Sequence, residues 1–307
     1  MTFRRYIAEE IAVDHADGLL TRREALRRLG LLGLGAAAAS SLLAACSSGG
    51  GSTAASSTST GTAASAGTAA SSSAAPPGLA GAKPTEAITF AGPQGQLQAA
   101  WAGANHPRGA VLVIHENKGL TDHIRSVAGR FAGAGYSALA IDLLSQEGGT
   151  ATFSDPAQAT AALSKVPPER FVADMKAGLT ELQRRSPNAK LGTTGFCMGG
   201  GLVWLLLASG EPRLAAATPF YGPLPANPDF SGSKAAVLAI YAALDSRVDA
   251  TRDAAAAALA KAGLVHEIVT EPDADHAFFN DTGARYNQAA ADDAWKRVIA
   301  WYGKYLA

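Results

Sequence analysis

The chain has 307 residues, with 26 basic and 26 acidic side chains, so its formal net charge at neutral pH is zero. That balance excludes a nucleic-acid-binding protein that depends on a strongly basic surface, and a charged fraction of 17% is too low for a highly charged disordered protein. Two cysteines are too few for a disulfide framework or a four-cysteine zinc site.

The first 46 residues have the pattern of an export signal. The run Thr21–Arg27 resembles the twin-arginine signature, and a mildly apolar stretch at 29–45 follows, which is marginal for a transmembrane helix. The stretch ends in Leu43-Ala-Ala-Cys46, which resembles the lipobox of bacterial lipoproteins. We therefore predict an exported cell-envelope lipoprotein that Cys46 anchors to the membrane, with its domain facing the periplasm or cell exterior. The alternative is an uncleaved signal anchor with an incidental cysteine.

Residues 47–82 have a different composition from the rest of the chain. They contain no charged or aromatic side chain and consist mainly of Ser, Gly, Ala and Thr. Such a segment buries too little apolar surface to offset the entropy lost on ordering. We therefore predict a disordered linker here, followed by one folded domain at residues 83–307.

Apolar runs typical of strands alternate with amphipathic runs typical of helices in residues 83–307. We expect strands at 87–90, 97–102, 110–115, 137–142, 190–195, 215–221, 236–241 and 265–271, and helices at 124–134, 171–185, 198–209, 252–262 and 289–305. This alternation predicts an α/β fold, with a doubly wound, mainly parallel sheet and helices on both faces. Ligands of such sheets bind beyond the carboxyl ends of the strands.

The clearest chemical motif is Gly195-Phe-Cys197-Met-Gly199-Gly, which lies between an expected strand and an expected helix. It has the form of a nucleophile elbow, G-x-S-x-G, with cysteine in place of serine. The turn raises the sulfur above the sheet at a helix N-terminus, where the helix dipole favours a thiolate. The alternative is a buried structural cysteine beside glycines that serve close packing.

Two later residues complete a possible triad with Cys197. Asp245 and His276 each follow an expected strand, and the chain order nucleophile, acid, histidine is that of α/β-hydrolases. His276 is expected to take and return the proton, and Asp245 to orient the imidazole and stabilise its cation. Rival acids lie close by in the sequence: Asp249, Asp273 and Asp275.

With these residues in place, the sequence resembles the dienelactone hydrolase family over most of residues 83–307. The matching segments are Ile114-His-Glu116-Asn-Lys-Gly119-Leu, Ile141-Asp-Leu-Leu144, the cysteine elbow, Asp245 and Asp275-His276-Ala-Phe278. The resemblance implies the α/β-hydrolase fold, a Cys197–His276–Asp245 triad and a monomer.

The resemblance also implies roles for residues that spacing alone would not single out. Glu116 matches a glutamate that contacts the resting thiol and is displaced when substrate binds. The backbone N–H groups of Met198 and Asn117 match the oxyanion hole, where preorganised donors stabilise a tetrahedral intermediate. Without the resemblance, Glu116 would be taken for a surface carboxylate.

One position departs from the family pattern. Asn280 stands where family members that act on dienelactones have an arginine that grips the substrate carboxylate. Arg170 and Arg285 are conceivable substitutes, but the spacing does not choose between them. A neutral lactone or ester is therefore the expected substrate. We expect no metal, no cofactor and no nucleic-acid partner, because the sequence has no metal-ligand spacing and no dinucleotide or phosphate-loop fingerprint.

The leading hypothesis is an exported, lipid-anchored hydrolase that cleaves a lactone or carboxylic ester through a cysteine triad and an acyl-enzyme. A second is a non-catalytic lipoprotein with the same fold that binds a ligand or partner. A third is a thioesterase.

Overall fold

The computed structural model describes residues 3–47 and 75–307, and the chain forms two compact units. The larger unit comprises Met1–Ala8 and Pro76–Ala307, and the smaller one comprises Glu9–Ala75. Most of the predicted linker, residues 48–74, lies outside the described part of the chain.

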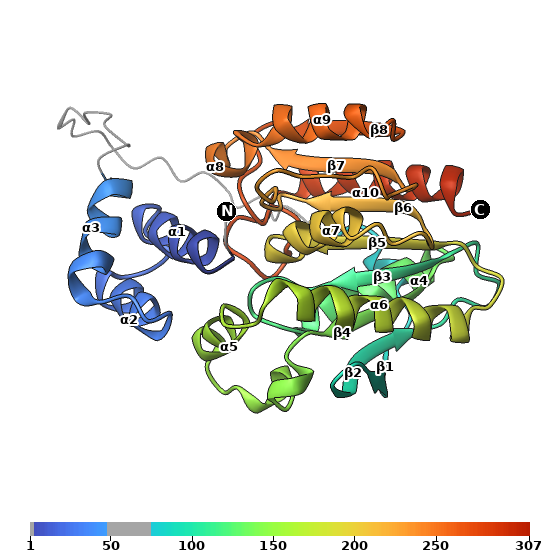
Figure 1. The fold of residues 1–307 in the computed structure, drawn as a ribbon, viewed down its shortest axis with the longest axis horizontal. Coiled ribbons are helices and arrows are strands. Elements are labelled where there is room, and N and C mark those ends of the chain that lie inside the picture. The colour runs from blue at the N-terminus through green and yellow to red at the C-terminus, as the bar shows by residue number, and fades with distance from the viewer. Residues whose placement is uncertain (1–2, 48–74) are drawn as a thin grey trace, which may run out of the picture. The chain divides into compact units, whose positions relative to one another are not determined.

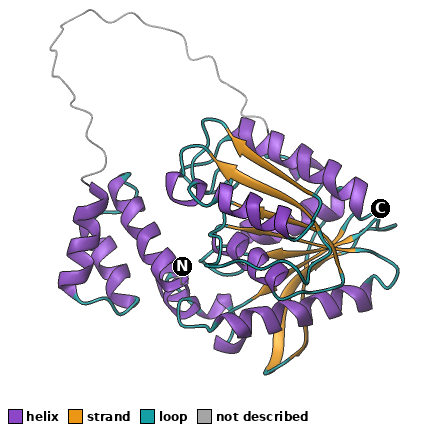
Figure 2. Cartoon of the chain, turned by 45° about the horizontal axis from the view of Figure 1, so that its top comes forward, coloured by secondary structure: helices purple, strands orange, loops and turns teal. Residues whose placement is uncertain are grey.

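The N-terminal segment is helical where it is described. It forms α1 (Phe3–Ala16), α2 (Arg22–Leu31) and α3 (Ala36–Ser47) (Figure 2). Cys46 falls in α3, but its side chain is outside the described part. Among the described residues, no helix combines the length and the apolarity that crossing a membrane requires. The predictions of export and lipidation at Cys46 stay predictions.

The larger unit is built on an eight-stranded sheet with the order β1-β2-β4-β3-β5-β6-β7-β8 (Figure 1). The strands are β1 (Glu86–Gly92), β2 (Gly95–Ala102), β3 (Ala110–Ile114), β4 (Ser137–Asp142), β5 (Leu191–Phe196), β6 (Leu214–Phe220), β7 (Ala236–Ala242) and β8 (His266–Glu271). The pairs β1–β2 and β2–β4 are antiparallel. The other six strands of the sheet order, β4-β3-β5-β6-β7-β8, run parallel to one another. The carboxyl ends of these six strands therefore meet at one edge.

Helices cover both faces of the sheet (Figure 2). They are α4 (Asp122–Gly133), α5 (Pro156–Leu163), α6 (Pro168–Arg185), α7 (Met198–Ala208), α8 (Ser246–Asp249), α9 (Arg252–Lys261) and α10 (Gln288–Tyr305). The helices α6 and α7 contact each other and the central strands, while α4 and α10 meet through Phe131 and Trp295, whose ring centroids lie 4.9 Å apart. This is the predicted doubly wound α/β architecture.

The core follows from the apolar runs of the central strands. Every residue of β3 and β4 is buried. Each fully buried Val, Leu or Ile side chain stabilises the fold by about 1.5–3 kcal/mol relative to an exposed one. These strands hold the edge at which the functional loops begin.

The second segment of the larger unit begins at Pro76, earlier than Lys83, where the sequence placed the start of the domain. Residues 79–81 form a short 3₁₀ helix, and the N–H of Lys83 donates to the carbonyl of Gly129 in α4 at 2.9 Å. A side chain on Gly129 or Gly133 would collide with the backbone of Lys83 or Gly81. These two glycines thus let the end of the predicted linker pack closely against α4. Composition does not reveal this contact, because it joins residues far apart in the sequence.

Candidate active site

Cys197 lies at a strained turn between β5 and α7. Its φ of 58° is in the left-handed region, which costs a non-glycine residue free energy. The glycines around it are required by space. A Cβ on Gly195 would lie 2.2 Å from the carbonyl of Gly199, and one on Gly199 would lie 2.5 Å from the carbonyls of Ile114 and His115. The elbow therefore packs tightly onto the end of β3 and lifts the Cys197 side chain beyond the sheet.

The ring of His276 is held by Asp245. The Nδ1 of His276 lies 2.6 Å from Oδ2 of Asp245, and both side chains are buried. Asp245 follows β7 and also accepts a hydrogen bond from the backbone N–H of Val248 at 3.2 Å, which caps the short helix α8. Because the carboxylate occupies Nδ1, the other ring nitrogen is available for proton transfer.

The acids that rivalled Asp245 in the sequence have other positions. Asp275 accepts the backbone N–H of His276 at 2.6 Å and pairs with Arg285 at 3.1 Å, so it does not hold the imidazole ring. Asp273 adopts a positive φ of 53° in the preceding turn, and Asp249 closes α8. The geometry therefore singles out Asp245 among these carboxylates.

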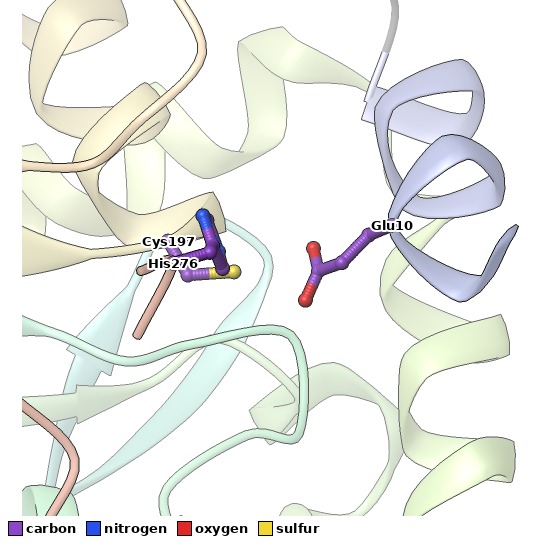
Figure 3. A group of neighbouring side chains, drawn as sticks. All are labelled: Glu10, Cys197 and His276. Atoms are coloured by element: carbon purple, nitrogen blue, oxygen red, sulfur yellow. The ribbon is translucent and has the colours of Figure 1, made fainter. Parts of the chain in front are cut away.

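Cys197 and His276 lie side by side (Figure 3). Sγ of Cys197 and a ring nitrogen of His276 are within 4.8 Å of each other, and the two residues are 2% and 3% exposed. Burial alone would lower the pKa of His276, but the charges of Asp245 and Cys197 and its bonds to both raise that pKa well above its usual range. Burial likewise opposes ionisation of Asp245, yet His276 keeps the pKa of that carboxyl lowered. The site thus favours the protonated form of His276 beside the ionised Asp245 carboxylate.

Glu116 reaches the same region from the loop after β3, but it makes a different contact from the one that the family resemblance implies. Its Oε2 accepts a hydrogen bond from Nδ2 of Asn280 at 2.7 Å, while Oε1 is buried and has no hydrogen-bond partner among the described residues. Neither carboxylate oxygen therefore makes a hydrogen bond to the Cys197 thiol among the described residues, and the contact that the resemblance implies stays a prediction.

The two residues expected to form the oxyanion hole follow neighbouring strands. Met198 is the first residue of α7, after β5, and Asn117 lies in the loop after β3. The Asn117 carbonyl accepts the hydroxyl of Thr160 at 2.8 Å, which ties this loop to α5. Both backbone segments therefore lie at the carboxyl edge of the β3–β5 pair, as a shared donor site requires.

Two tyrosines at the site were missed by sequence reasoning. The ring of Tyr221 lies 5.1 Å from that of His276, and burial, with smaller contributions from the charges of Glu116 and Cys197, raises the pKa of Tyr221 well above its usual range. The hydroxyl of Tyr6, in the part of α1 that belongs to the larger unit, lies 3.4 Å from Sγ of Cys197 and 3.3 Å from Nε2 of His276. Assigning residues 1–46 to a signal removed Tyr6 from consideration.

Tyr6 is held by contacts within the larger unit. Nη1 of Arg247 donates to the Tyr6 carbonyl at 3.1 Å, and its guanidinium lies 4.5 Å from the centre of the Tyr6 ring. A mainly apolar cavity of about 250 Å³ lies beside this residue, between the start of α1, the segment 164–168 and α7. Tyr6 therefore lines the cavity and also places its hydroxyl 3.4 Å from Sγ of Cys197.

The two arginines considered as binding groups for a substrate carboxylate both form ion pairs with acidic side chains. Arg170 makes bonds of 2.7 and 2.9 Å to the two carboxylate oxygens of Glu147, and its Nε lies 3.8 Å from Asp174. Arg285 pairs with Asp275. Both guanidinium groups therefore already pair with acidic side chains of the chain itself and are not positioned to bind a substrate carboxylate.

Comparison with known proteins gives consistent matches over the larger unit. The model of the dienelactone hydrolase family matches residues 97–306. A protein of Escherichia coli O157:H7 assigned as a carboxymethylenebutenolidase is 35% identical over 216 residues, which cover 65% of this chain and 78% of the relative.

Comparison with solved structures points to the same family. The crystal structure of a protein assigned as a dienelactone hydrolase from Klebsiella pneumoniae subsp. pneumoniae MGH 78578 superposes with a TM-score of 0.62 at 33% identity, covering 72% of this chain and 99% of that one. The dienelactone hydrolase-like promiscuous phosphotriesterase P91 from metagenomic libraries shares the fold, with a TM-score of 0.65 at 22% identity over 73% of this chain and 98% of that one.

Proposed function

Because the chain belongs to the dienelactone hydrolase family, we propose that it hydrolyses a carboxylic ester or lactone through Cys197, His276 and Asp245. The observation that carries the proposal is the 2.6 Å contact between Nδ1 of His276 and Asp245, on a ring that also lies within 4.8 Å of the Cys197 sulfur. This is the arrangement that nucleophilic catalysis needs: a nucleophile, a base beside it and an acid that orients the base.

The reaction begins with attack of the Cys197 thiolate on the ester carbonyl carbon. The thiolate is favoured by its place at the N-terminus of α7 and by the imidazolium of His276. A C–S bond forms and the carbonyl electron pair moves to oxygen, where the N–H groups of Met198 and Asn117 are proposed to stabilise the negative charge.

Collapse of this intermediate expels the alcohol oxygen. His276 gives that oxygen its proton, the C–O bond breaks and a thioester to Cys197 remains. Water then attacks the thioester while His276 accepts its proton, and the C–S bond breaks to release a carboxylic acid. In a lactone, the alcohol stays attached to the acyl chain, so one hydroxy acid leaves.

The charges near the site favour a neutral substrate. Arg170 and Arg285 are paired with acids. Asn280 is uncharged, and its amide donates to Glu116. These three residues therefore do not offer a positive charge to a substrate carboxylate. The neighbouring cavity is mainly apolar and would suit an uncharged acyl or alcohol group.

The purified full chain tests this function directly. Stopped-flow measurement with a p-nitrophenyl ester should give turnover with an initial burst of nitrophenol equal to the amount of enzyme. Release at the rate of the uncatalysed reaction would instead support the second hypothesis, a non-catalytic protein that binds a ligand.

Export and lipid anchoring are part of the same proposal. Cys46→Ala is expected to move the protein from the membrane fraction to the soluble fraction of cells, because one acylated cysteine would be its attachment point. The measurement is immunoblotting of the two fractions, with Cys197→Ala as the matched cysteine control that should stay in the membrane. Continued membrane retention of Cys46→Ala would point to an uncleaved signal anchor.

Tyr6 gives a further prediction for the full chain before the segment that precedes Cys46 is removed. The Tyr6 hydroxyl contacts both Cys197 and His276, where the reacting ester must bind, so these hydrogen bonds must break first. Tyr6→Phe removes them and should therefore raise kcat/KM about fivefold, which corresponds to one hydrogen bond of ~1 kcal/mol. Steady-state kinetics with Tyr302→Phe as a control for removal of a buried hydroxyl would check this. An unchanged or lower kcat/KM in Tyr6→Phe would contradict it.

A further inference from the structure

The carboxylate of Glu116 is held by a single hydrogen bond. Glu116 is only 6% exposed, its Oε2 accepts from Nδ2 of Asn280 at 2.7 Å, and its Oε1 has no hydrogen-bond partner among the described residues. A buried polar atom without a partner is costly, so a carboxylate in this state moves readily if its one bond is lost. Asn280 therefore decides where Glu116 rests.

The orientation of the Asn280 amide is fixed from its other end. Its Oδ1 accepts the backbone N–H of Thr282 at 3.0 Å and the Thr282 hydroxyl at 2.7 Å. Turning the amide around would place its oxygen against the Glu116 carboxylate and its NH₂ group against the Thr282 N–H. The amide nitrogen is thus committed to Glu116.

The next residue anchors the same loop to the first and last turns of α4. Asp281 accepts from Nδ1 of His123 at 2.6 Å and from Nη2 of Arg130 at 2.8 Å. Burial opposes ionisation of Asp281, but these two partners lower its pKa to about 2. Asp281 therefore anchors the loop that carries Asn280 through contacts that do not involve Glu116.

Glu116 and Cys197 act on the same surroundings. The charges of both contribute, after burial, to raising the pKa of Tyr221, so both lie within electrostatic range of one hydroxyl. A carboxylate that moved onto the sulfur would favour the protonated thiol and oppose the thiolate. Where Glu116 rests therefore bears on the state of the nucleophile.

We propose that Asn280 is a positioning residue that holds the Glu116 carboxylate away from the Cys197 thiol in the resting protein, so that the Cys197–His276 ion pair forms before substrate binds. This inference rests on the proposed role of Cys197 as the nucleophile. It differs from the substrate-triggered switch that the family resemblance implies, because Glu116 bonds to Asn280 and makes no hydrogen bond to the thiol among the described residues.

Alkylation of Cys197 by iodoacetamide across a range of pH tests the proposal in the full chain. Mass spectrometry of the peptide that contains Cys197 separates its labelling from that of Cys46. Asn280→Leu removes the donor, so the midpoint pH of alkylation should rise by about one unit, and labelling below the midpoint should slow about tenfold. Asn280→Asp, which keeps the acceptor for Thr282 and replaces only the donor, should shift the midpoint in the same direction and serves if Asn280→Leu fails to fold.

Two further variants separate positioning from a general effect on the loop. Glu116→Gln combined with Asn280→Leu should return the midpoint to the wild-type value, because the charge that Asn280 controls is gone. Asn287→Leu is the matched control: its amide donates to the Asp273 carbonyl in the same segment at 3.0 Å but does not touch Glu116, so the midpoint should not move.

An unchanged midpoint in a folded Asn280→Leu protein, or a shift that persists in the double variant, would overturn the proposal. Alkylation does not require turnover, so its outcome is distinguishable from failure of the proposed function. A protein that shifts as expected but cleaves no ester keeps the positioning role and loses the hydrolase assignment.

Discussion

Cys197→Ala is expected to lower kcat/KM for an ester about 1000-fold or more, because it removes the only atom proposed to bond covalently to the acyl group. Residual activity would come from the oxyanion hole and from substrate binding. The measurement is steady-state hydrolysis of a p-nitrophenyl ester by the full chain.

The matched control for that loss is Cys197→Ser. It keeps a nucleophilic atom on the same strained turn, with its φ of 58°, and replaces only sulfur by oxygen. It should retain more activity than Cys197→Ala but less than the wild type, since His276 must then deprotonate a much weaker acid. Equal rates for the wild type and Cys197→Ala would remove Cys197 from the mechanism.

Asp245→Asn should lower kcat about 100-fold to 10,000-fold, since the acid orients His276 and stabilises its cation. The pH profile should change as well. Burial lowers the pKa of His276, and the loss of the Asp245 charge and hydrogen bond removes much of what opposes it. The pKa should therefore fall, and activity should be lost at a lower pH on the alkaline side. Kinetics across pH measure both effects.

Asp249→Asn is the matched control for this prediction, because Asp249 is the last residue of α8, four positions after the carboxylate that bonds His276. Its profile should match that of the wild type. A large loss in Asp249→Asn together with a small one in Asp245→Asn would exchange the roles of the two acids.

The same pair makes a signed contribution to stability. The folded-state pKa of Asp245 is lowered, so its contribution is lost as pH falls through that pKa. The folded-state pKa of His276 is raised, so its contribution is full below the unfolded-state pKa and is lost as pH rises through the folded one. The pair therefore stabilises the fold most between these limits.

Much of the fold was predictable because its signals are local. The continuous apolar runs of β3 and β4 and the glycines around Cys197 identify buried strands and the elbow without reference to distant residues. The motif order then identified Asp245 and His276, and the structure brings both to the elbow. The helices α5 and α8 were not predicted, because they are short and their neighbours give no clear period.

The remaining features depend on contacts between residues far apart in the sequence. Tyr6 reaches a site nearly two hundred positions away. The bond from Asn280 to Glu116 joins two loops, and the departure of Asn280 from the family pattern was visible in the sequence although its partner was not. Residues 76–82 were assigned to the linker from their composition. Their packing against the glycines of α4 could not be predicted, because nothing in the sequence around those glycines indicates this contact.

Trapping the acyl-enzyme is the most direct test of the mechanism. The full chain would be mixed with a p-nitrophenyl ester, quenched with acid within the burst, digested and analysed by mass spectrometry. The account predicts one added acyl group on the peptide that contains Cys197, removable by hydroxylamine and missing in Cys197→Ala. Ester turnover with no acyl group on that peptide, or with the group on another residue, would contradict it.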